Sequence, residues 1–429
     1  MPFSTAFLAD GWSDFSVGSW ISVPAIVNRG LRYIYTHTPT LLRIAGGEHM
    51  TLGARPPHEE RFFVVEVSGA FSAPPRSLSL TPQQISAVRL GRNRAIRCTF
   101  ARAFARKTTR MELPLTTPRE PAQQTFLYSE PVSDLDHLKA DIAFLGIPFG
   151  DAYTFQEIVN DQTNMPAAMR QASNRIVRSL ERYDFDLDGP LYDGKPIRSV
   201  DCGDVCADPA DLKAHYRRAE AAVRKILAAG ALPIVIGGDH GIPIPVLRAL
   251  DREGPITLVQ VDQHIDWRDH VNGVREGYSS PIRRASEMAH VDEIFQIGLR
   301  ATGSARVEEV EAARAYGAHL ITAYELHELG MEAILARIPD GGRYYLTVDL
   351  DGMDPSIAPA VAGPCPGGVT FVQARRLIHG LVKKGRVLGM DVVEITPRVD
   401  VNRITCITAG RLIVNLIGAA VRAGYFDKP

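Results

Sequence analysis

The sequence has few of the features that mark secreted or membrane-embedded proteins. It contains five cysteines in 429 residues, an odd number without a C-x-x-C pair, which favours reduced thiols over a disulfide framework. No run of about 18 apolar residues predicts a membrane span. The first residues also lack the basic region followed by an apolar region that a secretory signal needs. We therefore expect a cytoplasmic protein without a membrane partner.

Internal repeats and low-complexity tracts are also missing, which argues against a repeat array. What is present is an ordinary globular composition, with 45% hydrophobic and 23% charged residues. The length allows one large α/β domain or two smaller domains, each with a buried core. Cys202 and Cys206 are expected to be buried, inert thiols, and metal binding is the alternative for them.

Charge is distributed unevenly along the chain. Residues 1–110 hold 14 basic and 6 acidic residues, a balance of +8, whereas the remainder holds 34 and 43, a balance of −9. Between Arg89 and Arg110 there are eight basic residues and no acidic one. Such a stretch is typical of an arm that binds nucleic acid or anionic lipid, or of an organellar presequence. We favour a disordered extension, or translated upstream sequence with the native start at Met111, and expect no nucleic-acid partner.

Two patterns alternate in the rest of the chain. Short apolar runs predict strands at 142–148, 232–238, 256–262, 294–298, 319–322, 344–349 and 387–395. Amphipathic segments between them predict helices, the clearest at 209–230, 306–317 and 371–385. Strands that alternate with helices predict a parallel sheet with helices on both faces. In such folds ligands bind at the carboxyl ends of the strands.

Acidic and histidine residues follow four of these strands at that end. They are Asp239 and His240 after 232–238, Asp262, His264 and Asp266 at the end of 256–262, Asp349, Asp351 and Asp354 at the end of 344–349, and Glu394 within 387–395. A single residue of this kind would be interpreted as a helix cap or a hydrogen-bonded core residue. So many at corresponding strand ends predict a functional site.

The predicted site requires positive charge. Four of its aspartates would bring four negative charges together, which a pocket does not tolerate without compensation. These are Asp262, Asp266, Asp349 and Asp351. Two divalent cations would neutralise them, with His240 and His264 as neutral nitrogen donors. Mixed carboxylate and imidazole ligands suit Mn²⁺, with Ni²⁺, Co²⁺ and Zn²⁺ as alternatives. Paired metals lower the pKa of a shared water molecule and prepare it for attack.

Four motifs resemble the signatures of the ureohydrolase family, which includes arginases, agmatinases and related guanidino hydrolases. They are, in order, GGDH at 237–240, DQHID at 262–266, TVDLDGMDPSIAPAVAGPCPGG at 347–368 and GMDVVEITP at 389–397. The similarity extends over residues 140–425 and includes the shorter motifs GIP, DCGD and QIGLR. Four motifs in this order, with their intervening strands and helices, make the resemblance specific.

The resemblance implies a three-layer α/β/α sandwich around a mostly parallel sheet of about eight strands. Residues 111–139 would form a lead-in arm and 140–429 the catalytic domain. The family implies two manganese ions, cleavage of a guanidinium group to urea and an amine, and assembly into homotrimers or homohexamers. The ligands implied for one ion are His240, Asp262, Asp266 and Asp349. Those for the other are Asp262, His264, Asp349 and Asp351, so that Asp262 and Asp349 bridge the two ions.

Further roles follow from the same resemblance. Asp266 would also orient the attacking water, and Glu394 would anchor the substrate guanidinium. The second role is physically sensible, because a cationic substrate needs an anion that the metals have not neutralised. Asp354 is expected to cap a turn. Gly237 and Gly238 are expected to let the backbone approach the site closely.

Three features depart from the family pattern. Glu276 precedes Gly277 where many relatives carry a histidine that transfers a proton, so we take Glu276 as a candidate for catalysis and substrate binding. His270 is the alternative proton donor, although a solvent-exposed loop histidine is expected. Gln263 replaces the usual alanine, and strand alternation predicts that its side chain points away from the metals. Residues 160–173 replace a Gly-Pro-rich segment.

The loop after the second motif bears on the substrate. Agmatine, a guanidino amine, would need an acidic or neutral outer pocket, which Glu276 or Asp269 would supply. A guanidino acid would need a cation, and the loop offers Arg268, Arg275, Arg283 and Arg284. We interpret the function as hydrolysis of agmatine to putrescine and urea. The alternatives are hydrolysis of guanidinobutyrate, guanidine or a biguanide, and a catalytically silent subunit that assembles with an active partner.

Overall fold

The computed structural model describes residues 113–427, except for 118–123, 151–160, 208–210 and 304, together with four short strands nearer the N-terminus. The chain divides into two compact units, Met1–Phe104 and Ala105–Pro429. In the first unit β1 (Leu31–Ile34) pairs antiparallel with β4 (Phe63–Glu66), and β2 (Leu41–Arg43) with β3 (His49–Thr51). The rest of the predicted extension, including its basic stretch, lies outside the described residues.

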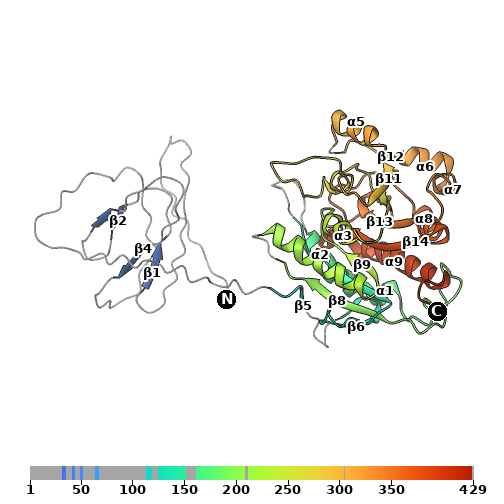
Figure 1. The fold of residues 1–429 in the computed structure, drawn as a ribbon, viewed down its shortest axis with the longest axis horizontal. Helices are drawn as coiled ribbons and strands as arrows, with labels where there is room; N and C mark the ends of the chain where they lie inside the picture. Colours follow the sequence, from blue (N-terminus) through green and yellow to red (C-terminus); the bar gives the residue numbers. More distant parts are fainter. Residues whose placement is uncertain are drawn as a thin grey trace, which may run out of the picture. The chain divides into compact units, whose positions relative to one another are not determined.

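The second unit is built around a ten-stranded sheet with the order β12-β11-β10-β13-β14-β9-β7-β8-β5, in which β6 also pairs with β8 (Figure 1). The eight longer strands are parallel to one another and include every strand predicted from the sequence. They are β7 (Ile142–Gly146), β8 (Ser199–Val205), β9 (Leu232–Ile236), β10 (Ile256–Val261), β11 (Val291–Leu299), β12 (His319–Thr322), β13 (Arg343–Asp349) and β14 (Arg386–Val393). The additional strands β5 (Thr116–Thr117) and β6 (Glu130–Pro131) are two residues long.

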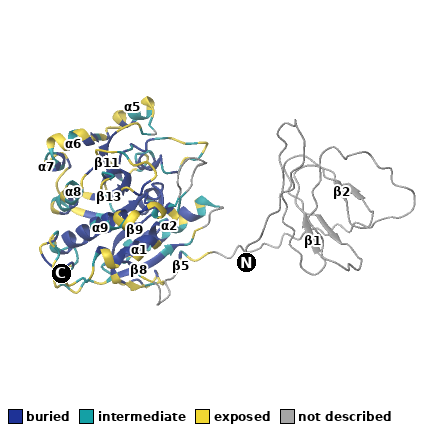
Figure 2. Ribbon diagram, turned by 180° about the vertical axis from the view of Figure 1, so that it is seen from behind, coloured by how far each residue is buried: buried dark blue, intermediate teal, exposed yellow. Residues whose placement is uncertain are grey.

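Helices cover both faces of the sheet, which confirms the predicted three-layer sandwich. Buried residues of β7 alternate between two cores, with Ile142 and Phe144 on one side and Ala143 and Leu145 on the other. The first core is completed by α1 (Met165–Ile176), α6 (Ala323–Leu329), α7 (Met331–Leu335), α8 (Phe371–Lys384) and α9 (Ile404–Arg422). The second is completed by α2 (Leu212–Ala228), α3 (Pro243–Ala249), α4 (Pro281–Ala285) and α5 (Val307–Tyr316). Figure 2 shows the buried strands between helices whose outer faces are exposed.

Short 3₁₀ helices complete the second unit, and several of them lie beside strand ends. They are η2 (Phe126–Tyr128), η3 (Gln162–Asn164), η4 (Leu350–Gly352), η5 (Pro397–Val399) and η6 (Val401–Arg403). Among these, η4 follows β13 directly, so the backbone turns as soon as that strand ends.

One helical segment, Val401–Arg422, is long and apolar enough to cross a membrane, but 83% of its most hydrophobic window is buried in the fold. Its α9 portion packs against α1 and α8. We therefore assign it as a core helix of the sandwich, whose hydrophobicity is explained by its burial.

Strand β8 is not predicted from the sequence because charged residues interrupt its apolar pattern. Asp201 and Asp204 on this strand bind the buried Arg170 of α1, and Arg170 Nε donates to Asp201 Oδ2 at 2.7 Å. Burial alone would lower the pKa of Arg170, but the two carboxylates outweigh burial and raise it. The DCGD motif thus holds α1 against the sheet.

Candidate metal centre

Four neighbouring strands bring the predicted site residues to one edge of the sheet. Strands β10, β13, β14 and β9 are consecutive and parallel, so their carboxyl ends lie together. The buried residues at these ends are His240, Asp262, Asp266, Asp349, Asp351 and Glu394. His264 lies among them and is partly exposed.

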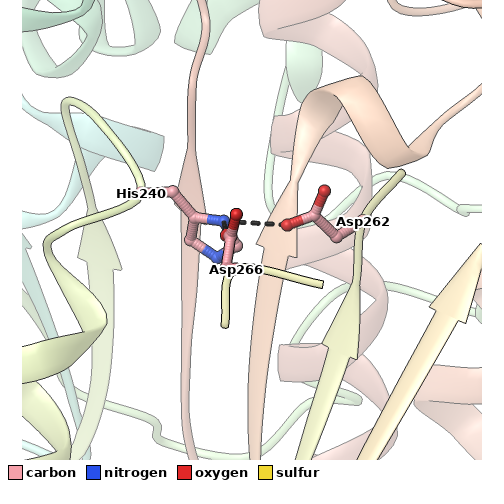
Figure 3. Close-up of side chains that lie close together, drawn as sticks. All are labelled: His240, Asp262 and Asp266. Atoms are coloured by element: carbon pink, nitrogen blue, oxygen red, sulfur yellow. Dashed lines mark ion pairs between the residues drawn. The ribbon is translucent and has the colours of Figure 1, made fainter. Parts of the chain in front are cut away.

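The first group of potential ligands surrounds His240 (Figure 3). His240 Nδ1 lies 2.8 Å from Asp266 Oδ2, 3.0 Å from Asp262 Oδ2 and 3.2 Å from Asp349 Oδ2. All four side chains are buried. Three carboxylates from two strand ends therefore face one imidazole nitrogen.

The other nitrogen of His240 determines which tautomer is present. The Thr347 hydroxyl donates to Asp391 Oδ1 at 2.7 Å, so its oxygen accepts from His240 Nε2–H at 3.0 Å. Tyr345 donates its hydroxyl to the second Asp391 oxygen. In the neutral imidazole that a metal ion requires, the lone pair is therefore on Nδ1, which is buried and makes no well-directed hydrogen bond to the carboxylates that face it. An orphaned nitrogen lone pair that faces three carboxylates suits a metal ligand.

The second group shares Asp262 with the first. His264 Nδ1 lies 3.2 Å from Asp351 Oδ2 and 3.4 Å from Asp262 Oδ1. Asp262 thus presents one oxygen to each histidine, as the predicted bridging ligand requires. Asp349 differs in that only its Oδ2 faces a histidine, at 3.2 Å from His240 Nδ1, while its Oδ1 accepts the backbone N–H of Asp351 at 2.8 Å. A bridging role for Asp349 stays a prediction.

The electrostatics of both groups call for a cation. Burial, together with the charge of Asp262, raises the pKa of Asp266 to about 7. Burial alone would lower the pKa of His264, but Asp351 and Asp262 outweigh it and raise the pKa to about 12. Protons are therefore held strongly where metal ions would bind. Carboxylate and imidazole donors without a thiolate suit Mn²⁺ and related divalent ions.

Backbone conformation helps to place these side chains. Asp266 and Glu394 adopt positive φ angles of 46° and 69°, a backbone conformation that is uncommon for non-glycine residues. A Cβ atom on Gly238 would collide with the carbonyl oxygen of Phe149. The absence of a side chain at Gly238 thus lets the backbone of Phe149 pack against it, while the expected close approach of Gly237 and Gly238 to the site stays a prediction.

Glu394 lies beside the first group without belonging to either. Its Oε1 accepts the backbone N–H of His240 at 2.8 Å, and its Oε2 accepts from Gln162 Nε2 at 2.9 Å. Burial raises its pKa, and the Gln162 hydrogen bond opposes that shift. A buried carboxylate held on both oxygens, next to the ligands, suits the predicted guanidinium anchor. The sequence alone predicts no role for Gln162, and the one signal at this position is the departure from the family pattern at residues 160–173.

Glu276 is not brought to this cluster by any polar contact among the described residues. Its carboxylate accepts instead from Arg248 of α3, and its backbone carbonyl accepts from the Tyr216 hydroxyl. The predicted catalytic and substrate-binding roles of Glu276 therefore stay predictions. His270 is solvent-exposed, as expected.

The charged residues of the same loop are paired, some within the loop and some with neighbouring elements. Arg268 contacts Glu309, and Arg283 contacts Glu287. Asp269 binds Arg275 and Arg284. Asp269, considered for an agmatine pocket, is therefore paired with arginines. The four arginines considered for a guanidino acid are likewise each paired with an acidic residue.

The prediction for Gln263 is wrong. Its side-chain Nε2 donates to Asp351 Oδ2 at 3.1 Å, so the amide points toward a predicted metal ligand. Strand β10 ends at Val261, and alternation no longer sets side-chain direction beyond that point. A second glutamine, Gln260, donates to Asp262 Oδ2 at 2.6 Å from within the strand. It was not identified from the sequence.

Asp354 has the structural role expected of it. Its carboxylate accepts from the backbone N–H groups of Ser356, Gly367 and Gly368. It is thereby engaged in closing the loop that follows η4. Cys202 and Cys206 are free thiols outside both potential ligand groups.

Comparison with known proteins gives a consistent result. The chain matches the arginase family over residues 140–418. It is 38% identical to guanidinopropionase of Pseudomonas aeruginosa over 228 residues, which covers 52% of this chain and 71% of the relative. It is 30% identical to agmatinase of Salmonella paratyphi B over 284 residues, covering 65% and 87%. The structure of proclavaminate amidino hydrolase from Streptomyces clavuligerus superposes with a TM-score of 0.63 at 26% identity, covering 72% of this chain and all of that one.

Proposed function

Because this chain belongs to the arginase family and is a guanidino hydrolase within it, we propose that it releases urea from a small guanidino acid. The observation that carries the proposal is the pair of carboxylate–imidazole groups that share Asp262, with the buried Glu394 beside them. The groups offer a cation centre, and Glu394 offers a separate anion for the guanidinium. Agmatine is the second candidate, since an agmatinase is among the relatives.

The roles of the chain's own residues follow from the geometry. Glu394 would accept guanidinium N–H groups and hold the planar carbon against the cluster. Gln162 and the backbone of His240 would keep that carboxylate in place. Asp266 would orient the attacking water. Two divalent cations bound by the cluster would supply an activated water molecule and electrostatic stabilisation of the tetrahedral intermediate.

The charged residues around the candidate site bear on whether the substrate has a carboxylate or an amine at its other end. The agmatine interpretation relied on Glu276 and Asp269, and both carboxylates are paired with arginines. Arg398 lies four residues after Glu394, with its side chain exposed and its backbone N–H donated to Asp161. An exposed cation on the segment that follows the guanidinium anchor would suit a carboxylate tail. The more similar of the two curated relatives is named for a guanidino acid.

A substrate panel tests the proposal. Urea release would be measured with guanidinopropionate, guanidinobutyrate, agmatine, arginine and guanidine, with Mn²⁺ and then Ni²⁺ added. We expect a guanidino acid to give the highest kcat/KM and Arg398→Ala to raise its KM without changing that for guanidine. Highest activity on agmatine would overturn the acid preference. Two bound ions without turnover on any compound would favour the silent subunit.

Two further properties are part of the proposal. We propose a homotrimer or homohexamer, which light scattering on the purified protein would measure. We also propose a cytoplasmic location, in keeping with the four described cysteines, Cys202, Cys206, Cys365 and Cys406, all being free thiols. Fractionation of the cells that make the protein would test the location.

A further inference from the structure

Gln263 occupies a position between the second ligand group and an exposed loop. It follows Asp262 immediately and the residue is 7% exposed. Its Nε2 donates to Asp351 Oδ2 at 3.1 Å and to the carbonyl oxygen of Gly363 at 2.7 Å. Both of these partners are acceptors, so the orientation of the amide is determined by its contacts.

The same residue also reaches the other oxygen of Asp351. The backbone N–H of Gln263 donates to Asp351 Oδ1 at 3.3 Å. Asp351 is thus held on both oxygens by one residue. The oxygen held by the Gln263 side chain, Oδ2, is the one that lies 3.2 Å from His264 Nδ1. Gln263 therefore fixes the atom that the second group offers to a cation.

The first group has no such dependence on Gln263. Its carboxylates Asp262 and Asp266 are approached by the amide of Gln260, at 2.6 Å and 3.5 Å. Gln260 in turn accepts from the buried Gln296. Each ligand group thus has its own glutamine, one inside β10 and one just beyond it.

Gln263 also connects the second group to the loop that carries Gly363. The backbone N–H of Thr396, two residues after Glu394, donates to Ala360 in that loop at 2.9 Å. The loop is thereby tied both to the segment after β14 and, through Gln263, to Asp351. Rigid support of this kind keeps a carboxylate in the orientation that a metal ion requires.

We propose that Gln263 is a positioning residue that fixes Asp351 and so controls binding of the second cation, independently of the first. The inference rests on the metal centre that the proposed function requires. Partners that orient ligands typically contribute about 10–100-fold to metal affinity. Loss of Gln263 should therefore weaken one of the two ions by about that factor and leave the other unchanged.

The experiment measures metal binding without substrate. Gln263→Met keeps the length of the side chain and removes both donor contacts, and Gln263→Ala is the second variant in case the methionine does not fit. Gln171→Met, at an exposed position of α1, is the matched control. Full-length metal-free proteins would be titrated with Mn²⁺ by calorimetry, and the spin coupling of paired ions would be followed by electron paramagnetic resonance. Circular dichroism would confirm folding.

We expect wild type and the control to bind two ions and to show the coupled signal. The Gln263 variants should bind the first ion normally and the second about 10–100-fold more weakly, with loss of the coupled signal at limiting Mn²⁺. Two ions bound with wild-type affinity, or both weakened equally, would overturn the inference. A wild type that binds two ions but releases no urea would contradict the proposed function alone. A wild type that binds no ion would overturn both.

Discussion

The two halves of the candidate metal centre differ in how far they are enclosed. The first half, around His240, is buried. His240 Nε2 is hydrogen-bonded to the Thr347 hydroxyl, which in turn donates to Asp391, so buried polar residues hold the imidazole in place. The second half, around His264, has that side chain 26% exposed and takes its support from Gln263. Charges interact more strongly when they are enclosed, so we expect the first cation to be held more tightly. The second half is the part of the centre that is open to solvent.

The largest expected effect comes from removing the residue that both halves share. Asp262→Asn keeps the shape of the side chain but removes the charge that faces both histidines. We expect tight binding of both ions to be lost and urea release to fall by at least about a thousandfold. Metal analysis after desalting and a urea assay would measure these changes. Asp354→Asn is the control, because that aspartate only caps a loop; equal losses in the two variants would contradict a shared ligand.

A change beneath His240 should affect the first half alone. Thr347→Val removes the oxygen that accepts the Nε2 proton of His240. The tautomer that has its lone pair on Nδ1, facing the cation, is then no longer favoured. We expect affinity for the first ion to fall about 10–100-fold, as measured by Mn²⁺ titration. Tyr345→Phe, which removes only the outer bond to Asp391, should have a smaller effect. Wild-type affinity in Thr347→Val would mean that the tautomer is set by other contacts.

Protons should compete with cations in the buried half. The pKa of Asp266, raised to about 7 by burial and by Asp262, implies that the metal-free carboxyl is protonated below that pH. We expect Mn²⁺ affinity to fall more steeply with decreasing pH below about pH 7 than above it, where the raised pKa values of His240 and His264 leave only the histidine protons to compete. The same raised pKa gives the metal-free fold stability that is present below about pH 4 and lost as the pH rises through 7.

Calorimetry and thermal unfolding at several pH values would measure both trends. Mn²⁺ should raise the melting temperature more at about pH 8 than at about pH 5.5, since its affinity is higher there. Asp266→Asn should show a flatter dependence of affinity on pH. An affinity that does not change with pH in the wild type would show that no buried carboxyl has to release a proton.

The smallest effect is expected from removing the N-terminal region. A chain that begins at Met111 retains nearly all of the unit Ala105–Pro429. We expect its metal content and urea release to stay within about twofold of the full chain, because the described ligands all lie beyond residue 239. If the basic stretch binds nucleic acid, only the full chain will show salt-dependent binding. A large loss of activity on truncation would assign the region to the catalytic unit.

The positions of the ligands follow from local pattern in the sequence. Apolar runs predict parallel strands, and polar residues that end such runs must lie at one edge of the sheet. His240, Asp262 and Asp351 come together for this reason although they are far apart in the chain. Strand β8 was not predicted because its aspartates interrupt the apolar pattern. They bind Arg170 on α1, and the sequence pattern gives no sign of that pairing.

Contacts beyond the strand ends could not be obtained in the same way. Alternation predicts side-chain direction only while the backbone stays extended, and Gln263 lies past the end of β10. The positive φ angles of Asp266 and Glu394 likewise interrupt the extended backbone, so strand alternation does not predict the direction of their side chains. Glu276 occupies the position of a family histidine, yet its carboxylate contacts Arg248 on a neighbouring helix.

The order of residues along the chain is enough to predict which residue types gather and what chemistry they imply, because charge neutrality and strand geometry are local rules. Which atom of each residue faces its neighbour depends instead on the three-dimensional packing. It alone shows that Thr347 leaves His240 Nδ1 free for a cation and that Gln162 holds Glu394. Those contacts join segments as much as 232 residues apart, and their geometry depends on how helices, loops and strands pack together.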